Sequence, residues 1–159
     1  MAKKGKKAKS TGWYERQEAA RSSALGAAST SKPRLFLTYS YLHADEAIVA
    51  ALQQELSKFF QVAGPATMGK PDDIRKGQAR IVDAIKSSDL LIAVLPGETA
   101  STSVMAELAF ARASGKPVAI VSKNVPKLAR TLGSQFFRSV NDLEEVLHKS
   151  GPSALLSPT

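Results

Sequence analysis

Five short apolar runs, each followed by a stretch with helical spacing, constrain the fold of this chain more than any other feature. The clearest run, Leu-Leu-Ile-Ala-Val-Leu, spans residues 90–95 and shows no alternation of apolar and polar side chains. Such a run is typical of a strand that is buried on both faces of a sheet. The other runs cover residues 34–40, 61–66, 117–121 and 135–140. Strands that alternate with helices form parallel sheets, so we expect an α/β fold.

The stretches between the apolar runs predict the helices that cover this sheet. In residues 44–60, apolar side chains recur every three or four positions from Ile48 to Phe59, which is the spacing of one helical stripe. Asn141 and Glu144 have capping-box spacing at the start of a last helix. The other helices are expected over residues 77–87, 103–114 and 124–132.

Right-handed crossovers favour the flavodoxin-like, doubly wound strand order 2-1-3-4-5 for this pattern. In such a fold, ligands bind beyond the carboxyl ends of strands 1 and 3, where the direction of winding reverses. Three predicted loops should meet there, over residues 40–43, 65–77 and 96–103. We therefore expect the functional site at this edge of the sheet.

Length and composition exclude several classes of protein. The 159 residues suit one domain. No apolar run is long enough to span a membrane, and no apolar signal segment stands near the start of the sequence, so we expect a cytoplasmic protein. The sequence has no cysteine, which excludes disulfides, thiolate zinc sites and cysteine nucleophiles.

The net charge of +8 is concentrated at the start of the sequence. Residues 1–34 hold nine Lys or Arg and two Glu, whereas the remaining 125 residues sum to +1. We therefore expect a basic flexible tail and linker over residues 1–33, a folded domain over 34–150 and a C-terminal tail over 151–159. The basic tail either serves solubility alone or binds polyanions without sequence preference.

Common catalytic motifs are absent from the sequence. It contains no G-x-G-x-x-G, no Walker loop and no G-x-S-x-G elbow. Two histidines, His43 and His148, are too few and too far apart to suggest a metal site. We therefore expect neither a bound cofactor nor a metal.

Glu107 is the acidic residue that best fits a catalytic role. It lies on the helix predicted after strand 3, beside the expected site, and apolar residues flank it. That setting is unusual for a solvated glutamate. The residues alone leave two interpretations open, because a glutamate near a helix N-terminus also stabilises the helix dipole.

Several segments resemble the TIR (Toll/interleukin-1 receptor) family. Residues 35–40, Leu-Phe-Leu-Thr-Tyr-Ser, with Asp45 downstream, resemble its opening strand, with Thr38 at the first serine of F-[IVL]-S-Y-S. Ser101, Glu107 and Leu108 resemble the signature S-x-W-C-x-x-E-L, with Ser103 at the tryptophan and Val104 at the cysteine. Residues 73–77, 81–89, 91–96 and 115–120 resemble the intervening and following segments in order.

This resemblance implies an enzyme that uses NAD+ as a substrate. It assigns Glu107 the role of the carboxylate that contacts the nicotinamide ribose, and an NAD+ glycohydrolase or ADP-ribosyl cyclase would follow. The same resemblance implies a setting in innate (antiphage) defence or signalling, homo-oligomers through TIR–TIR contacts, and a separate sensor or effector protein. Further substrate-binding residues would be Ser40, Tyr41, Asp73, Gly77 and Ser103.

Two alternatives remain open beside this interpretation. Nucleoside 2-deoxyribosyltransferases also place a catalytic glutamate on the helix after a central strand, in the setting E-x-G-x-A. The segment from Glu107 to Ala111 resembles that setting loosely, with Ala109 at the glycine. The second alternative is a non-catalytic TIR adaptor that acts by association.

Overall fold

The computed structural model describes residues 32–39, 46–64, 74–95 and 101–156. The chain divides into two compact units at Lys32–Pro33, and the second unit contains every element considered below. Its five strands are β1 (Arg34–Tyr39), β2 (Gln61–Ala63), β3 (Leu90–Val94), β4 (Val118–Val121) and β5 (Gln135–Phe137).

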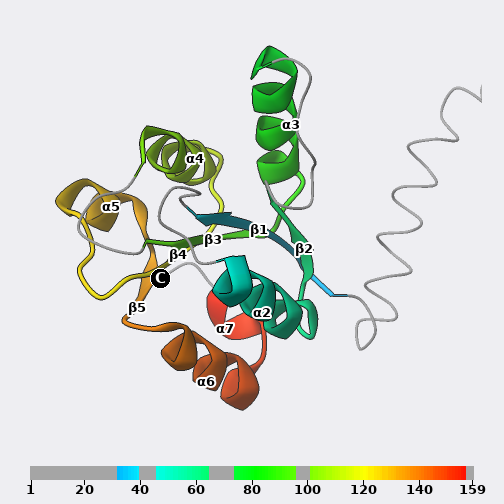
Figure 1. Cartoon of the computed structure of the whole chain (residues 1–159), viewed down its shortest axis with the longest axis vertical. Coiled ribbons are helices and arrows are strands. Elements are labelled where there is room, and N and C mark those ends of the chain that lie inside the picture. Colours follow the sequence, from blue (N-terminus) through cyan, green and yellow to red (C-terminus); the bar gives the residue numbers. More distant parts are fainter. Residues whose placement is uncertain (1–31, 40–45, 65–73, 96–100, 157–159) are drawn as a thin grey trace, which may run out of the picture. The chain divides into compact units, whose positions relative to one another are not determined.

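These strands form one sheet in the order β2-β1-β3-β4-β5, and every neighbouring pair is parallel. The predicted α/β class, the doubly wound five-stranded sheet and its strand order are therefore confirmed. β1 lies between β2 and β3 (Figure 1). The winding thus reverses at the carboxyl ends of β1 and β3, as expected from the sequence.

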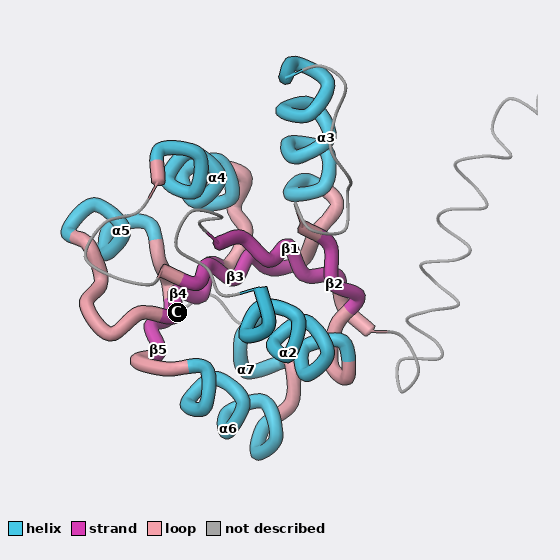
Figure 2. Tube along the Cα trace, viewed as in Figure 1, coloured by secondary structure: helices cyan, strands magenta, loops and turns pink. Residues whose placement is uncertain are grey.

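Helices cover both faces of the sheet, as the two ribbon views show (Figures 1 and 2). One face packs against α2 (Glu46–Ser57), α6 (Val140–Ser150) and α7 (Ser153–Leu156). The other face packs against α3 (Ile74–Lys86), α4 (Thr102–Ala113) and α5 (Lys127–Leu132).

The alternation of side chains along β1 assigns each residue to one of these faces. Leu35, Leu37 and Tyr39 belong to the core beneath α2 and α6. Phe36 belongs to the core beneath α3 and α4. Successive strand residues point to opposite faces, so Thr38 lies on the same face as Phe36. This places a polar side chain against α4.

Two features near the C-terminus differ from the sequence-based expectation. The N-cap of α6 is Ser139, whose hydroxyl accepts a hydrogen bond from the Asp142 backbone N–H at 3.2 Å, so the capping box predicted at Asn141 is wrong. α7 lies in the segment expected to be a tail, and its Leu155 is only 1% exposed. Because this leucine contributes to the core, the ordered domain extends to residue 156.

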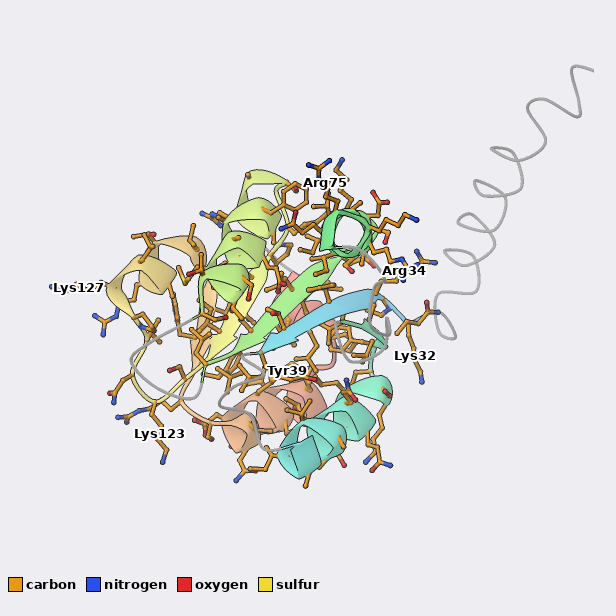
Figure 3. All side chains as sticks on the ribbon, turned by 45° about the horizontal axis from the view of Figure 1, so that its top comes forward. Lys32, Arg34, Tyr39, Arg75, Lys123 and Lys127 are labelled. Atoms are coloured by element: carbon orange, nitrogen blue, oxygen red, sulfur yellow. The ribbon has the colours of Figure 1, made fainter. Side chains whose placement is uncertain are left out.

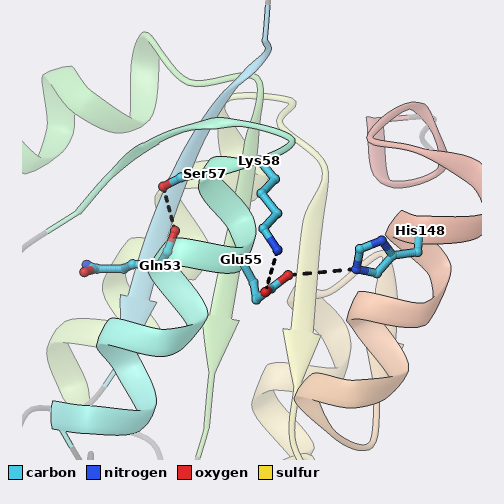
Figure 4. Close-up of polar contacts among 5 residues, drawn as sticks. All are labelled: Gln53, Glu55, Ser57, Lys58 and His148. Atoms are coloured by element: carbon cyan, nitrogen blue, oxygen red, sulfur yellow. Dashed lines mark hydrogen bonds and ion pairs between the residues drawn. The ribbon is translucent and has the colours of Figure 1, made fainter.

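A surface contact joins α2 to α6. Glu55 accepts a hydrogen bond from the Lys58 ammonium at 2.8 Å, and this bond is the main reason why the pKa of Glu55 is lowered. The second carboxylate oxygen lies 3.9 Å from Nε2 of His148 (Figure 4). Both partners of the His148 contact are partly solvated, so the contact adds little to stability.

Among the described residues, no helix is long and apolar enough to cross a membrane.

Two chain segments pack closely together at the carboxyl end of β2. A Cβ atom on Gly64 would collide with the carbonyl oxygen of Leu37. Glycine therefore permits this close approach of the two chain segments beside the switch point.

Candidate active site

Glu107 lies on α4, the helix that follows β3 and covers the face on which Thr38 lies. The buried residues of this helix are Val104, Glu107, Leu108 and Ala111. Their spacing of three and four residues defines the apolar stripe by which a helix packs on a sheet. Glu107 therefore occupies a core position of α4 rather than a solvated one.

Ser101 caps the first turn of α4, and Glu107 takes no part in this cap. The Ser101 hydroxyl accepts a hydrogen bond from the Val104 backbone N–H at 3.3 Å and lies 3.2 Å from the Ser103 hydroxyl. Glu107 is the sixth residue of the helix, counted from Thr102. Interaction with the helix dipole falls off within the first turn. This geometry weakens the helix-dipole interpretation of Glu107.

The carboxyl of Glu107 is buried, with 8% of the residue exposed. Among the described residues, its Oε2 atom has no hydrogen-bond partner. A buried acceptor without a partner costs free energy, on the order of 1–3 kcal/mol and more for a charged group. Native proteins retain such groups where a ligand, a water or a reaction uses them.

Thr38 is the polar side chain that affects the pKa of this carboxyl. It is 1% exposed, and within the described part of the chain its hydroxyl also has no hydrogen-bond partner. Burial raises the pKa of the Glu107 carboxyl above its ordinary value, whereas the Thr38 hydroxyl acts in the opposite direction. The hydroxyl thus favours the ionised carboxylate, although the two groups do not form a close hydrogen bond in this structure.

Ser122 is the third buried side chain with an unpartnered oxygen in the described ranges. It follows β4 directly, and its backbone N–H donates to the Phe137 carbonyl at 2.9 Å. Val118 and Ile120 of the same strand pack beneath α4 and α5. Alternation therefore places Ser122 on the same face of the sheet as Thr38 and Glu107.

These three oxygens come from β1, α4 and the end of β4. Thr38 and Ser122 lie at the carboxyl ends of their strands, and Glu107 faces that region from α4. A buried carboxylate and unpartnered buried hydroxyls on one face of the sheet suit a polar ligand with several hydroxyl groups, such as a sugar. A carboxylate in this setting can also stabilise positive charge that develops on a sugar carbon.

Sequence reasoning selected Glu107 but missed Thr38 and Ser122 as site residues. Thr38 was noticed only as a departure from the TIR strand pattern. The available signal was a hydroxyl residue at the carboxyl end of a run of otherwise buried apolar residues. A hydroxyl at such a position is buried at the margin of the core, at the carboxyl edge of the sheet.

The other predicted site residues do not converge on Glu107 within the described ranges. Ser40, Tyr41 and Asp73 lie outside the described residues. Gly77 was expected at a loop and instead lies inside α3. Ser103 is exposed in the first turn of α4, where its hydroxyl contacts Ser101.

No group of three or more His, Asp and Glu side chains in the described ranges could hold a metal ion.

Comparison of the sequence with family models gives no match, and no curated protein matches it. The fold resembles that of several solved structures. A conserved protein from Enterococcus faecalis V583 has a TM-score of 0.62 at 19% identity, over 75% of this chain and 99% of that one. The 2-deoxyribosyltransferase from Bacillus psychrosaccharolyticus has a TM-score of 0.57 at 17% identity, over 70% of this chain and 90% of that one.

The CMP N-glycosidase of Clostridium botulinum is also similar, with a TM-score of 0.50 and 22% identity over 73% of this chain and 98% of that one. At these identities the likeness shows the fold. It is the fold of a 2-deoxyribosyltransferase that is described as a biocatalyst for the synthesis of nucleosides, and of a CMP N-glycosidase.

These neighbours correct the resemblance to TIR domains. The named enzymes whose fold this chain resembles are a 2-deoxyribosyltransferase and a CMP N-glycosidase rather than TIR domains, so its assignment to the TIR family is wrong. The inferred NAD+ glycohydrolase or cyclase activity and the setting in innate defence and signalling are overturned with it. The segments that resembled TIR domains form a buried parallel strand and the chain segments beside the switch point. Doubly wound folds of different functions share these features, so the resemblance does not identify the family.

Proposed function

We propose that this protein is an enzyme that cleaves the N-glycosidic bond of a nucleoside or nucleotide, with Glu107 as its catalytic carboxylate. The observation that carries this proposal is the buried, unpartnered carboxyl oxygen of Glu107 at the switch point of the sheet. A structural glutamate at a core position would be expected to have its oxygens paired. The names of the 2-deoxyribosyltransferase and the CMP N-glycosidase support the same bond type.

The proposed reaction proceeds in two displacements. The ionised carboxylate of Glu107 attacks the anomeric carbon of the sugar, the C–N bond breaks, and its electron pair leaves with the base, which takes up a proton from solvent. Water, or the nitrogen of a second base, then attacks the same carbon, gives up a proton to solvent and releases the carboxylate. The transition states resemble an oxocarbenium ion, so a negative charge beside the sugar lowers both barriers.

Burial of Glu107 serves this chemistry and also opposes it. In a site that excludes water, the carboxylate interacts more strongly with a developing cation than it would in solvent. The same burial raises the pKa of Glu107 and so favours the neutral acid, which cannot attack. The Thr38 hydroxyl counteracts this effect, and we assign it the role of a positioning residue that keeps the carboxylate reactive.

The test is the release of base from a panel of substrates by the full-length protein. Ribonucleosides, 2′-deoxynucleosides and their 5′-monophosphates are incubated with the protein, each with and without a second free base, and the products are separated by chromatography. We expect free base, or an exchanged nucleoside, from at least one member of the panel. NAD+ serves as the control and should remain intact. Turnover of NAD+ alone, or of no member of the panel, would contradict the proposal.

The remaining predictions on partners are independent of this reaction. Formation of a homo-oligomer, association with a separate sensor or effector, and polyanion binding by residues 1–33 stay predictions, and residues 1–31 lie outside the described part of the chain.

A further inference from the structure

The two helical layers of the folded unit carry charge of opposite sign. α3, α4 and α5, which cover one face of the sheet, hold seven Lys or Arg and two Asp or Glu. α2, α6 and α7, which cover the other face, hold one Lys and five Asp or Glu. The formal charge of the helices is therefore +5 on the first face and −4 on the second. The sheet separates a basic layer from an acidic one.

The seven cations of α3, α4 and α5 form a basic face, and all of their side chains are exposed. They are Arg75, Lys76, Arg80, Lys86, Arg112, Lys127 and Arg130. Of the two acids on the same helices, Glu107 is buried and Asp83 is exposed. These helices therefore present a single carboxylate among seven cations to the solvent.

The cations of the basic face extend over the whole width of this helical layer. α4 lies between α3 and α5 and contacts both (Figure 1). Arg75 on α3 and Lys127 on α5 project outward at the two ends of the layer (Figure 3). Packed helices lie about 8–10 Å apart, so about 16–20 Å separates the axes of α3 and α5. A ligand that contacts both ends must span this distance, which excludes a single phosphate group.

Cations at both ends of the basic face are available to a partner. Lys76 and Lys127 form no ion pair with an acidic residue of the described ranges. On the opposite layer, by contrast, the Lys58 ammonium lies 2.8 Å from the carboxylate of Glu55. Clustered cations that acids do not neutralise raise the local concentration of anions, and a ligand with many negative charges gains most from such a surface.

Three kinds of partner could meet this surface, and the structure favours one of them. A helix that lies on a membrane buries a row of large apolar side chains, whereas Leu128 is the exposed large apolar residue of α3, α4 and α5 in the described ranges. The acidic layer of a second copy would offer exposed ion pairs worth about 0–1 kcal/mol each, against an association cost of about 4–15 kcal/mol. A nucleic acid releases condensed counterions on binding, a gain that a folded protein partner does not offer.

We propose that the basic face of α3, α4 and α5 binds the phosphate backbone of a nucleic acid without reading its sequence. The phosphates of each strand of a duplex lie about 3.4 Å apart along its axis, so several of them fall within the width of the layer. Lys and Arg side chains that contact phosphate oxygens position a nucleic acid and carry no sequence information. The proposal does not depend on the N-glycosidic reaction, and it concerns a different surface from the polyanion binding predicted for residues 1–33.

The test compares two double variants of the full-length protein in binding to a fluorescent DNA duplex of mixed sequence. Lys76→Gln with Lys127→Gln removes one cation from each end of the basic face. Lys58→Gln with Lys149→Gln is the matched control, because it changes the net charge equally but at the end of α2 and on α6. Residues 1–33 are present in every protein, so their contribution cancels in the comparison. Fluorescence anisotropy gives the association constant at a series of salt concentrations.

The dependence of binding on salt counts the phosphate contacts. Each contact with duplex DNA contributes about −0.9 to the slope of the logarithm of the association constant against the logarithm of the salt concentration. The slope of the Lys76→Gln, Lys127→Gln protein should therefore be shallower than that of wild type by about 1.8. The Lys58→Gln, Lys149→Gln protein should keep the wild-type slope.

Equal slopes for wild type and both variants would overturn the proposal, because the basic face would then make no contact with the duplex. An equal decrease in the two variants would overturn it as well, since only net charge would matter. Binding to vesicles of phosphatidylserine and phosphatidylcholine, and sedimentation at low salt, test the other partners. Loss of vesicle binding or of self-association in the Lys76→Gln, Lys127→Gln protein, with an unchanged duplex slope, would assign the basic face to a membrane or to a second copy instead.

Discussion

The buried carboxyl of Glu107 on α4 has its pKa raised by burial, and the buried hydroxyl of Thr38 on β1 acts in the opposite direction on that pKa. Burial favours the neutral acid, and the hydroxyl favours the carboxylate. The balance between these two effects sets the pH range in which Glu107 is ionised. A nucleophile that must be charged works only above that range.

Thr38→Val should move the acidic limb of the pH profile to higher pH. The substitution nearly preserves the shape of the side chain and removes the hydroxyl that lowers the pKa of Glu107. The pKa therefore rises further above its ordinary value. The measurement is kcat/KM for base release as a function of pH, with Thr38→Ser as the variant that restores the wild-type profile. An acidic limb that does not move in Thr38→Val would contradict the assigned role of Thr38.

Glu107→Gln should change how stability depends on pH. The native pKa of Glu107 is raised above the ordinary value of 4.5, so the folded protein holds this proton more tightly than the unfolded chain. The wild-type protein therefore loses stability as the pH rises from the unfolded pKa through the raised native one. Glutamine does not titrate and escapes this loss.

The free energy of unfolding of Glu107→Gln, relative to wild type, should consequently increase with pH across that interval and then level off. Urea unfolding of both proteins at a series of pH values measures it, and the other titrating groups cancel in the difference. A difference that is constant with pH would show that Glu107 is not desolvated in the folded protein.

Leu155→Ala tests whether the domain extends to α7. Leu155 is 1% exposed and packs in the core beneath α2 and α6. Its truncation should lower the free energy of unfolding by about 2–5 kcal/mol, as at other buried leucines. Leu128→Ala is the control, because Leu128 is 65% exposed and its loss should change stability by less than about 0.5 kcal/mol. Equal effects of the two variants would place residues 151–159 outside the core.

Ser139→Ala should destabilise the start of α6. Its hydroxyl accepts from the Asp142 backbone N–H at 3.2 Å, and loss of such a cap costs about 0.5–2 kcal/mol. Asn141→Ala should have a smaller effect, because Asn141 is already inside the helix. The two free energies of unfolding, measured by urea titration, compare the caps directly. A larger loss in Asn141→Ala would support the capping box instead.

The sheet was predictable because its strands are specified locally. The runs at residues 90–95 and 117–121 have no polar residue to place on a solvated face, so both faces had to be covered. Right-handed crossovers then left few strand orders. The α6 cap was missed because Ser139 and Asn141 both suit an N-cap, and only the backbone geometry distinguishes them.

The site was predictable only in part, because burial is a property of the assembled fold. The sequence placed Glu107 on the helix after β3 among apolar residues, but its position on the buried stripe of α4 appears only in the structure. The hydroxyls of Thr38 and Ser122 lie on the same face of the sheet, on β1 and after β4. Their common face follows from strand order and register, which no local pattern records.

The family assignment failed for a related reason. The residues that resembled a TIR domain lie largely in β1, β3 and α4, where the fold itself dictates apolar and small side chains. Such residues report the architecture and not the substrate. The proposed chemistry depends instead on the few polar side chains at the carboxyl edge of the sheet.

The central claim is that Glu107 is the carboxylate that attacks the sugar and displaces the base, and the rate of base release by Glu107→Gln tests it most directly. The substitution preserves shape and removes charge, so about 3–4 kcal/mol of transition-state stabilisation should be lost, or roughly a hundredfold to a thousandfold in rate. Glu145→Gln is the control, because Glu145 is exposed on α6 beside Lys149 and lies outside the site. We predict wild-type rates for Glu145→Gln and near-complete loss for a folded Glu107→Gln protein; equal rates for wild type and Glu107→Gln would contradict the account.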